Sequence, residues 1–413
     1  MSLQGPIVVI ADKPAAEIIG ALAAGGAFPV VEATWADAPA AIGKIAPAAV
    51  ILADPDIAAA VHGNTEALCL AIFAARVPYM PVLERVHPGA TALLPHALPI
   101  GAGEPVERTL ARLAAALRVR TLDLSVRRRS ETIRSSGGVA PILRDSDPLD
   151  DATVLVLGRG RTYPKLSVAV GERVGLIGAL SIDIATRYLN ARDIDGVFIG
   201  DGFGSHAVEA FLQSLADDAR FRDLPIALLP GMTVTASHAH LPNMETIAGE
   251  PADMVARFIP LVRQHAYATR LQRLLAAIEA KGMVDPETGL FTVAAFLRDL
   301  QRAIPEAAER GSDLSIARFS FDEPLDQRMS LDAARLVSRL VRSSDFACQT
   351  SDGSILLVFS ATTLRSAHVV ARRIASVLKH TMLTRERRID PTITLATLKA
   401  SDTVETLIAR VNA

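Results

Sequence analysis

Short apolar runs alternate with helix-length, alanine-rich stretches from Ile7 to Leu229, and the alternation occurs twice at similar spacing. Each run predicts a strand: Ile7–Ile10, Phe28–Val31, Ala48–Leu52 and Tyr79–Leu83 in the first copy, then Val154–Leu157, Val174–Ile177, Gly196–Ile199 and Ile226–Leu229 in the second. A parallel strand needs a crossover to return the chain, and that crossover is usually a helix. The pattern therefore predicts two copies of one α/β unit with parallel sheets.

A different pattern begins at Asp285. It predicts an α+β domain with an antiparallel hairpin, in the order helix 293–304, strand 314–321, helix 332–342, strand pair 346–359, helix 365–381, strand 392–398 and a terminal helix from 401. A long helix over 254–280 precedes it and carries an apolar stripe at helical spacing, typical of a connecting or dimer-forming stalk: Phe258, Val262, Leu271, Leu274, Leu275 and Ile278.

These patterns set the expected domain boundaries. They are a first α/β domain at 1–130, a linker at 131–150, a second α/β domain at 151–252, a connecting helix at 253–283 and an α+β domain at 284–413.

Composition limits the class of protein. Apolar residues make up 50% of the 413 residues and the net charge is -2, so the chain is folded and has no field that would attract nucleic acid unaided. Cys69 and Cys348 are far apart, which predicts neither a disulfide framework nor a thiolate zinc site. Without a predicted signal peptide or membrane span, we expect a soluble cytoplasmic protein.

Three motifs near the C-terminus resemble one family. Arg342-Ser343-Ser344-Asp345 forms an RxxD motif, five residues ahead of the pentapeptide Ser351-Asp352-Gly353-Ser354-Ile355, and Val284–Leu290 (VDPETGL) lies upstream. Their order and spacing resemble the GGDEF domain of diguanylate cyclases, from about Asp285 to the C-terminus. Two flavodoxin-like receiver (βα)5 domains ahead of it would give the layout of PleD-like response regulators. Among these the chain most resembles the PopA type, in which the cyclase domain binds cyclic di-GMP without making it.

The catalytic positions implied by this resemblance are altered. Synthesis of cyclic di-GMP needs two metal ions on the triphosphate, and therefore carboxylates on the first strand and in the hairpin. Here Ser354 stands in place of the last acid of the signature, and Ser320 stands in place of the first-strand aspartate. Asp352 falls at the position of the second glycine, one residue before the aspartate of the signature. Asp322 matches only the second acid of the DxD segment. We therefore expect no cyclase activity and no metal site; the alternative is a divergent active cyclase.

The RxxD motif is intact, and the resemblance places it at the family's product-binding position. A guanidinium can donate two hydrogen bonds to guanine N7 and O6, and a carboxylate can accept from N1–H and N2–H. Arg342 and Asp345 therefore suit one guanine. Arg373 lies where the family supplies a second guanidinium. The expected ligand is cyclic di-GMP, as an effector rather than a cofactor.

The receiver-like domains have incomplete phosphorylation sets. Asp12 follows the first strand and Asp54 follows the third, so Asp54 is a candidate phosphoacceptor with Asp12 as its acidic partner. Val82–Glu84 offers no hydroxyl, and the following strand offers no lysine. In the second domain, Asp201 is at best a displaced phosphoacceptor in a glycine loop.

Together these features predict a non-catalytic cyclic di-GMP receptor that works as a signalling adaptor through protein contacts. The resemblance implies other adaptors of a ClpXP protease pathway as partners, a cell-cycle role and recruitment to a cell pole. The stalk helix predicts a homodimer. A ligand-free receiver scaffold is the remaining alternative.

Overall fold

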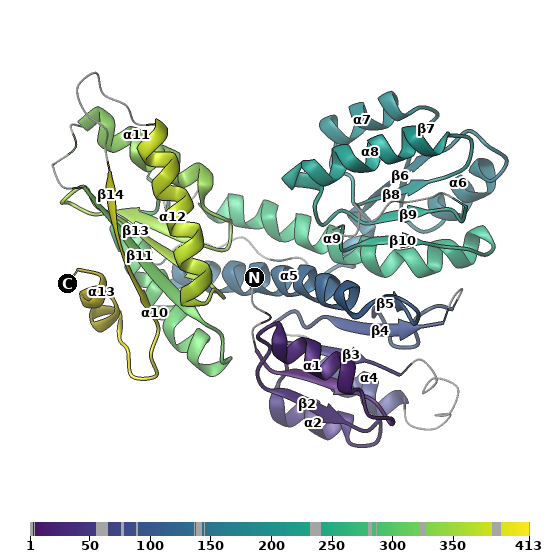
Figure 1. Ribbon diagram of the computed structural model, residues 1–413, viewed down its shortest axis with the longest axis horizontal. Coiled ribbons are helices and arrows are strands. Elements are labelled where there is room, and N and C mark those ends of the chain that lie inside the picture. Colours follow the sequence, from purple (N-terminus) through teal and green to yellow (C-terminus); the bar gives the residue numbers. More distant parts are fainter. Residues whose placement is uncertain are drawn as a thin grey trace.

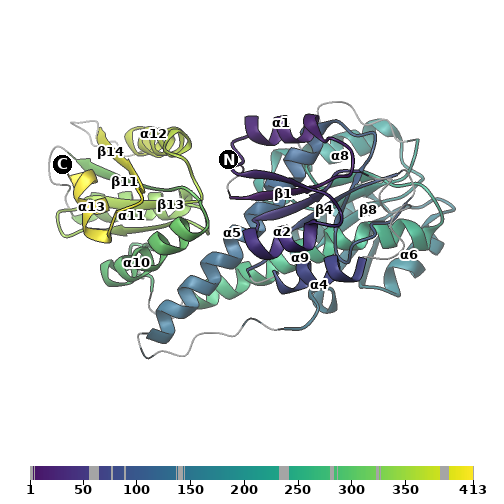
Figure 2. The same cartoon turned by 90° about the horizontal axis from the view of Figure 1, so that it is seen from below.

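The computed structural model describes residues 3, 5–54, 65–75, 78–87, 90–135, 137, 143, 145–231, 241–279, 283–285, 287–321, 325, 327–381 and 390–412. It contains two five-stranded parallel sheets and one four-stranded antiparallel sheet. Two long helices, α5 (Val106–Ser135) and α9 (Pro251–Glu279), lie side by side between the parallel-sheet units and the antiparallel one, as both views show (Figures 1 and 2). No helix in the described part of the chain is long and apolar enough to cross a membrane.

The first α/β unit has the strand order β2-β1-β3-β4-β5, which is the flavodoxin-like order. Its central strands are completely apolar and buried, as expected where helices cover both faces. The elements are β1 (Ile7–Ile10), α1 (Ala16–Ala24), β2 (Val30–Ala33), α2 (Ala38–Ile45), β3 (Ala49–Leu52), α4 (Thr65–Ala74), β4 (Val82–Val86), β5 (Leu98–Gly101) and α5.

The second unit repeats this order as β7-β6-β8-β9-β10, which confirms the predicted pair of parallel α/β units. Its elements are β6 (Thr153–Leu157), α6 (Tyr163–Gly171), β7 (Gly175–Ala179), α7 (Ile182–Ala191), β8 (Gly196–Ile199), α8 (Ser205–Asp217), β9 (Ile226–Leu228), β10 (Met244–Thr246) and α9, with short 3-10 helices η1 (Pro148–Asp151) and η2 (Ala219–Phe221).

The first unit departs from the predicted pattern around β4. The predicted strand 79–83 was placed too early: the N–H of Tyr79 donates to Asp123 on α5 at 2.8 Å, so this backbone is tied to the helix, and β4 begins at Val82. Within the described residues between β4 and β5 there is no helix. Instead, the buried carboxylate of Glu84 accepts the N–H groups of Leu93 and Leu94 at 2.7 and 2.9 Å, which fixes the connection to the strand.

The C-terminal domain has the sheet order β12-β13-β11-β14. Helices α11 and α12 share one apolar core with one face of the sheet, and α10 and α13 share another core with the opposite face. The elements are α10 (Val293–Glu309), β11 (Leu314–Phe321), α11 (Gln327–Leu340), β12 (Phe346–Gln349), β13 (Ile355–Ser360), α12 (Leu364–Thr381), β14 (Pro391–Thr397) and α13 (Val404–Asn412). The predicted antiparallel hairpin is β12–β13, which confirms an α+β domain here.

The apolar stripe of α9 is covered within the chain. Phe258, Val262 and Leu271 are at most 2% exposed, and they belong to cores that also include residues of α5. The stripe therefore gives no support to a dimer, and the expected homodimer stays a prediction. Helix α5 continues to Ser135, so it crosses the boundary expected at residue 130 and forms the second half of the stalk.

Candidate functional site

The RxxD residues form one tight turn between α11 and β12. The N–H of Asp345 donates to the carbonyl of Arg342 at 3.0 Å and closes the turn. Arg342 and Ser343 are exposed, whereas Asp345 is only 7% exposed. Within the described residues the Arg342 side chain has no hydrogen bond or ion pair, so its guanidinium can bind an anion without first breaking a protein contact.

Burial of the Asp345 carboxylate disfavours its ionised form. Its Oδ1 accepts the Ser360 N–H at 3.0 Å and the Ser344 hydroxyl at 3.4 Å, while Oδ2 has no hydrogen bond among the described residues. Burial raises the pKa of Asp345 to about 6, although the Ser360 hydrogen bond and the nearby Arg342 and Arg129 guanidinium groups lower it. A carboxylate with a raised pKa and an unpaired oxygen, next to an unpaired arginine, is typical of a binding site.

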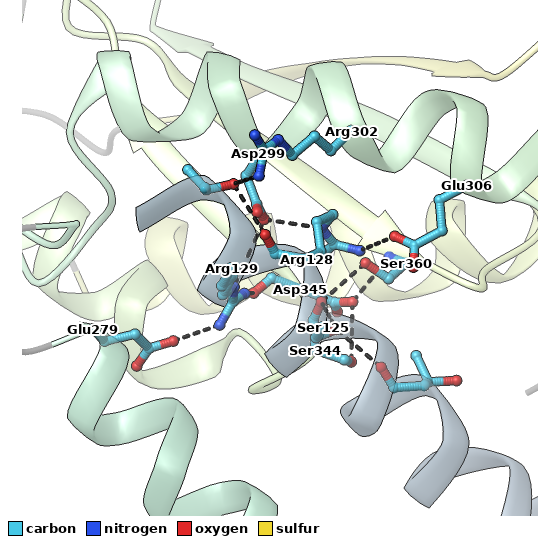
Figure 3. A network of polar contacts seen from close by, with 12 residues as sticks. Ser125, Arg128, Arg129, Glu279, Asp299, Arg302, Glu306, Ser344, Asp345 and Ser360 are labelled. Carbon is cyan, nitrogen blue, oxygen red and sulfur yellow. Dashed lines mark hydrogen bonds and ion pairs between the residues drawn. The ribbon is translucent and has the colours of Figure 1, made fainter. Parts of the chain in front are cut away.

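Helix α5 holds this turn from behind (Figure 3). Arg129 Nη2 donates to the carbonyl of Asp345 at 2.9 Å, and the Ser360 hydroxyl donates to the carbonyl of Ser344 at 2.9 Å. The Ser125 hydroxyl lies 3.5 Å from the Ser344 carbonyl. The backbone of the turn is therefore fixed to both β13 and the stalk.

The same helix joins the C-terminal domain through buried ion pairs. Arg128 Nε donates to Asp299 at 3.2 Å and its Nη1 to Glu306 at 3.2 Å, while Arg129 pairs with Glu279 of α9 (Figure 3). Arg128 and Arg129 are 8% and 0% exposed. Arg128 and Arg129 belong to a run of three arginines that, from the sequence alone, is typical of a solvent-exposed helix face, yet both bind acids inside the protein.

Arg373 lies on the exposed side of α12, the helix that follows β13. Within the described residues it has no ion pair. No contact joins it to Arg342 or Asp345 in that part of the chain. The structure therefore brings Arg342 and Asp345 together, while Arg373 remains a free cation on a neighbouring element.

A cleft of about 870 Å³ opens beside Arg342. One wall is the turn at 342–344, the floor is formed by α5 and α9, and the opposite wall is the second α/β unit around the end of α7 and η2. The lining carries charges of both signs. Arg118 on the floor pairs with Asp223, and Arg220 on the far wall pairs with Asp218. Arg192 and Arg342 have no ion pair among the described residues, and Phe221 adds an aromatic ring. The volume lies in the range of small-ligand sites. Sequence reasoning missed the cleft because its lining comes from distant segments.

In the hairpin that carries the altered signature, Asp352 binds the side chains around it. Asp352 Oδ2 pairs with Arg318 of β11 at 2.7 Å and accepts the Ser354 hydroxyl at 3.0 Å, and its Oδ1 accepts from Thr350 and from the Ser354 N–H. These partners, first the Thr350 hydroxyl, hold the pKa of Asp352 well below its ordinary range. Asp322 lies outside the described residues. No group of three or more metal-ligating side chains is found among the residues that are described.

The candidate phosphorylation residues lie at the ends of adjacent strands. Asp12 follows β1 and accepts the Trp35 N–H at 3.1 Å, and Asp54 follows β3, which pairs with β1. In the second unit, Asp201 accepts the Thr162 N–H at 3.4 Å, and its carbonyl accepts from Arg159 and Gly160. Phosphorylation of Asp54 stays a prediction.

Comparison with known proteins gives matches only among solved structures. The sequence matches no family model and no curated protein. The coiled coil and GGDEF domain of DgcB from Caulobacter crescentus, in complex with c-di-GMP, is similar over 35% of this chain and 84% of its own, at 19% identity and a TM-score of 0.30.

Two further solved structures are similar over part of the chain. The diguanylate cyclase SiaD from Pseudomonas aeruginosa, in complex with its activator SiaC, is similar over 35% of this chain and 61% of its own, at 19% identity and a TM-score of 0.31. The active GGEEF domain of a diguanylate cyclase from Vibrio cholerae is similar over 28% of this chain and 82% of its own, at 16% identity and a TM-score of 0.26.

Proposed function

We propose that this protein is a non-catalytic receptor for cyclic di-GMP that acts as a signalling adaptor. The observation that carries the proposal is the turn that brings together Arg342, exposed and without an ion pair among the described residues, and the buried Asp345, whose Oδ2 has no hydrogen bond among them. Residues 342–344 of this turn line the cleft. A guanine edge complements this pair, and the two ligand phosphates complement Arg192 in the cleft and Arg373 on α12.

The absence of catalysis is part of the proposal. Asp352, the acid of the hairpin pentapeptide, is already bound to Arg318. Serines stand at positions 320 and 354, where carboxylates would hold metal ions. Incubation of the protein with GTP and magnesium, followed by chromatography, tests this part. The proposal predicts no cyclic di-GMP, and product that disappears in a Ser354→Ala variant would overturn it.

The adaptor role rests on the connection between the turn and the stalk. Arg129 joins Asp345 to α5 and, through Glu279, to α9, so a ligand that shifts the turn also acts on both stalk helices. The sheet order of the two α/β units is that of receiver domains. Their incomplete phosphorylation sets support their use as docking surfaces rather than as a second active site. Homodimerisation and ClpXP-pathway partners remain proposals.

The site is tested by competition. A labelled cyclic di-GMP should be displaced by the unlabelled dinucleotide far better than by GMP, because the mononucleotide satisfies only the Arg342–Asp345 part of the site. Equal displacement by GMP would contradict a site built for both halves of the ligand.

A further inference from the structure

The floor of the cleft contains a buried amide without partners. Gln264 of α9 lines the cleft and is 5% exposed, yet neither its Nε2 nor its Oε1 has a hydrogen bond. Of the described side chains, it alone has two buried polar atoms without a hydrogen bond. Unpaired buried polar atoms cost free energy, so a side chain of this kind calls for a partner that is not part of the chain.

The groups around Gln264 do not supply that partner. His265 Nδ1 and the Thr269 hydroxyl both contact Asp195 Oδ1, at 3.1 and 3.3 Å, and so satisfy one another. A second buried amide in the lining is half satisfied: Asn243 donates through Nδ2 to the Asp223 carbonyl at 2.7 Å, but its Oδ1 is unpaired at 4% exposure.

We infer that the Gln264 amide binds the second purine base of the ligand within this cleft. This inference rests on the proposed function. A glutamine amide has one donor and one acceptor side by side, which complement the O6 acceptor and N1–H donor of guanine. The unpaired Oδ1 of Asn243 gives the lining a further acceptor for an amino group. A dinucleotide that lies between Arg342 and the second α/β unit is thereby recognised at both bases.

The walls of the cleft suit a base. Val119 and Leu122 of α5 and Leu224 of the second unit provide apolar surface, and Phe221 provides a ring, with the Arg220 guanidinium 4.9 Å from its centroid. Flat apolar and aromatic surfaces favour stacking of a nucleobase, and buried amides beside them fix its orientation. Arg192 has no ion pair within the described residues and lies on the same wall, where a phosphate can reach it.

The test replaces the amide by an apolar side chain of similar size. In Gln264→Met, removal of two unpaired polar atoms should raise the melting temperature of the free protein by about 2 to 4 °C. The same change should weaken cyclic di-GMP binding about tenfold in calorimetric titration of the full chain. Gln301→Met, at an exposed position of α10, is the matched control and should change neither.

The outcomes separate this inference from the proposed function. If Gln264→Met gains stability but binds as tightly as wild type, the amide does not contact the ligand and the inference is wrong, while the function stands. If Arg342→Ala binds as tightly as wild type and Gln264→Met does not, the RxxD site is wrong. If wild type does not bind, the proposed function fails and the inference fails with it.

Discussion

The buried carboxylate of Asp345 makes a prediction that opposes the usual effect of mutation. Raising a carboxyl pKa from an ordinary 3.8 to about 6 disfavours the ionised form in the folded protein. At about 1.4 kcal/mol for each tenfold change in proton affinity, the cost at neutral pH is about 3 kcal/mol. Asp345→Asn removes the charge and keeps an oxygen for the Ser360 N–H, so we expect a more stable protein that binds cyclic di-GMP poorly.

The pH dependence follows from the direction of the shift. Because the folded pKa is the higher one, stability falls as pH rises from about 4 to about 6, and the full penalty applies above that window. The advantage of Asp345→Asn should be about 3 kcal/mol at pH 7.5 and about half of that at pH 5. Urea unfolding followed by circular dichroism at the two pH values measures it.

Asp352→Asn is a control of opposite sign. Its carboxylate has a lowered pKa, held first by Thr350 and also by Arg318, so its stabilising effect is present at neutral pH and is lost in acid. This variant should lose stability at pH 7.5. A less stable Asp345→Asn protein at pH 7.5, or one that binds as tightly as wild type, would refute the reasoning about Asp345.

Three more predictions concern the same region. Cyclic di-GMP affinity should fall as pH drops below about 6, where Asp345 takes up a proton and loses its acceptor role; a flat titration series from pH 7.5 to 5 would argue against that role. Arg129→Met should cost about 3–5 kcal/mol in unfolding experiments, because Asp299 and Glu279 lose a buried partner, and should weaken ligand binding without touching the ligand. Ser354→Glu alone should give no product from GTP, because position 320 still lacks a carboxylate; cyclase activity would show that the hairpin alone was limiting.

The sequence was sufficient where local pattern determines structure. The strand predicted at 314–321 is β11 with the same bounds, and the repeated α/β pattern is found in both parallel sheets. Alternating apolar residues and turn formers are local signals, so these elements could be predicted. The turn from Arg342 to Asp345 also could be located, because its motif is contiguous.

The remaining features depend on contacts between distant segments. Arg128 and Arg129 resemble a solvated basic run until α10 supplies Asp299 to both, 170 residues later or more. The residues from Tyr79 onward have the sequence pattern of a strand, but in the structure the Tyr79 N–H donates to Asp123 of α5 instead of to a neighbouring strand. The cleft has no sequence signal at all, because its lining comes from distant segments. That the buried amide of Gln264 has no hydrogen-bond partner can be known only from the structure.

Calorimetric titration of cyclic di-GMP into the full chain and into Arg342→Ala tests the central claim most directly. Loss of a hydrogen bond to a charged group costs about 1.5–3 kcal/mol, so wild type should bind saturably and Arg342→Ala roughly ten- to a hundredfold more weakly. Arg372→Ala should weaken cyclic di-GMP binding less than Arg342→Ala does, since the Arg372 side chain points about 100° around α12 from that of Arg373. Equal affinity in wild type and Arg342→Ala, or no heat of binding in either, would contradict a cyclic di-GMP site at the RxxD turn.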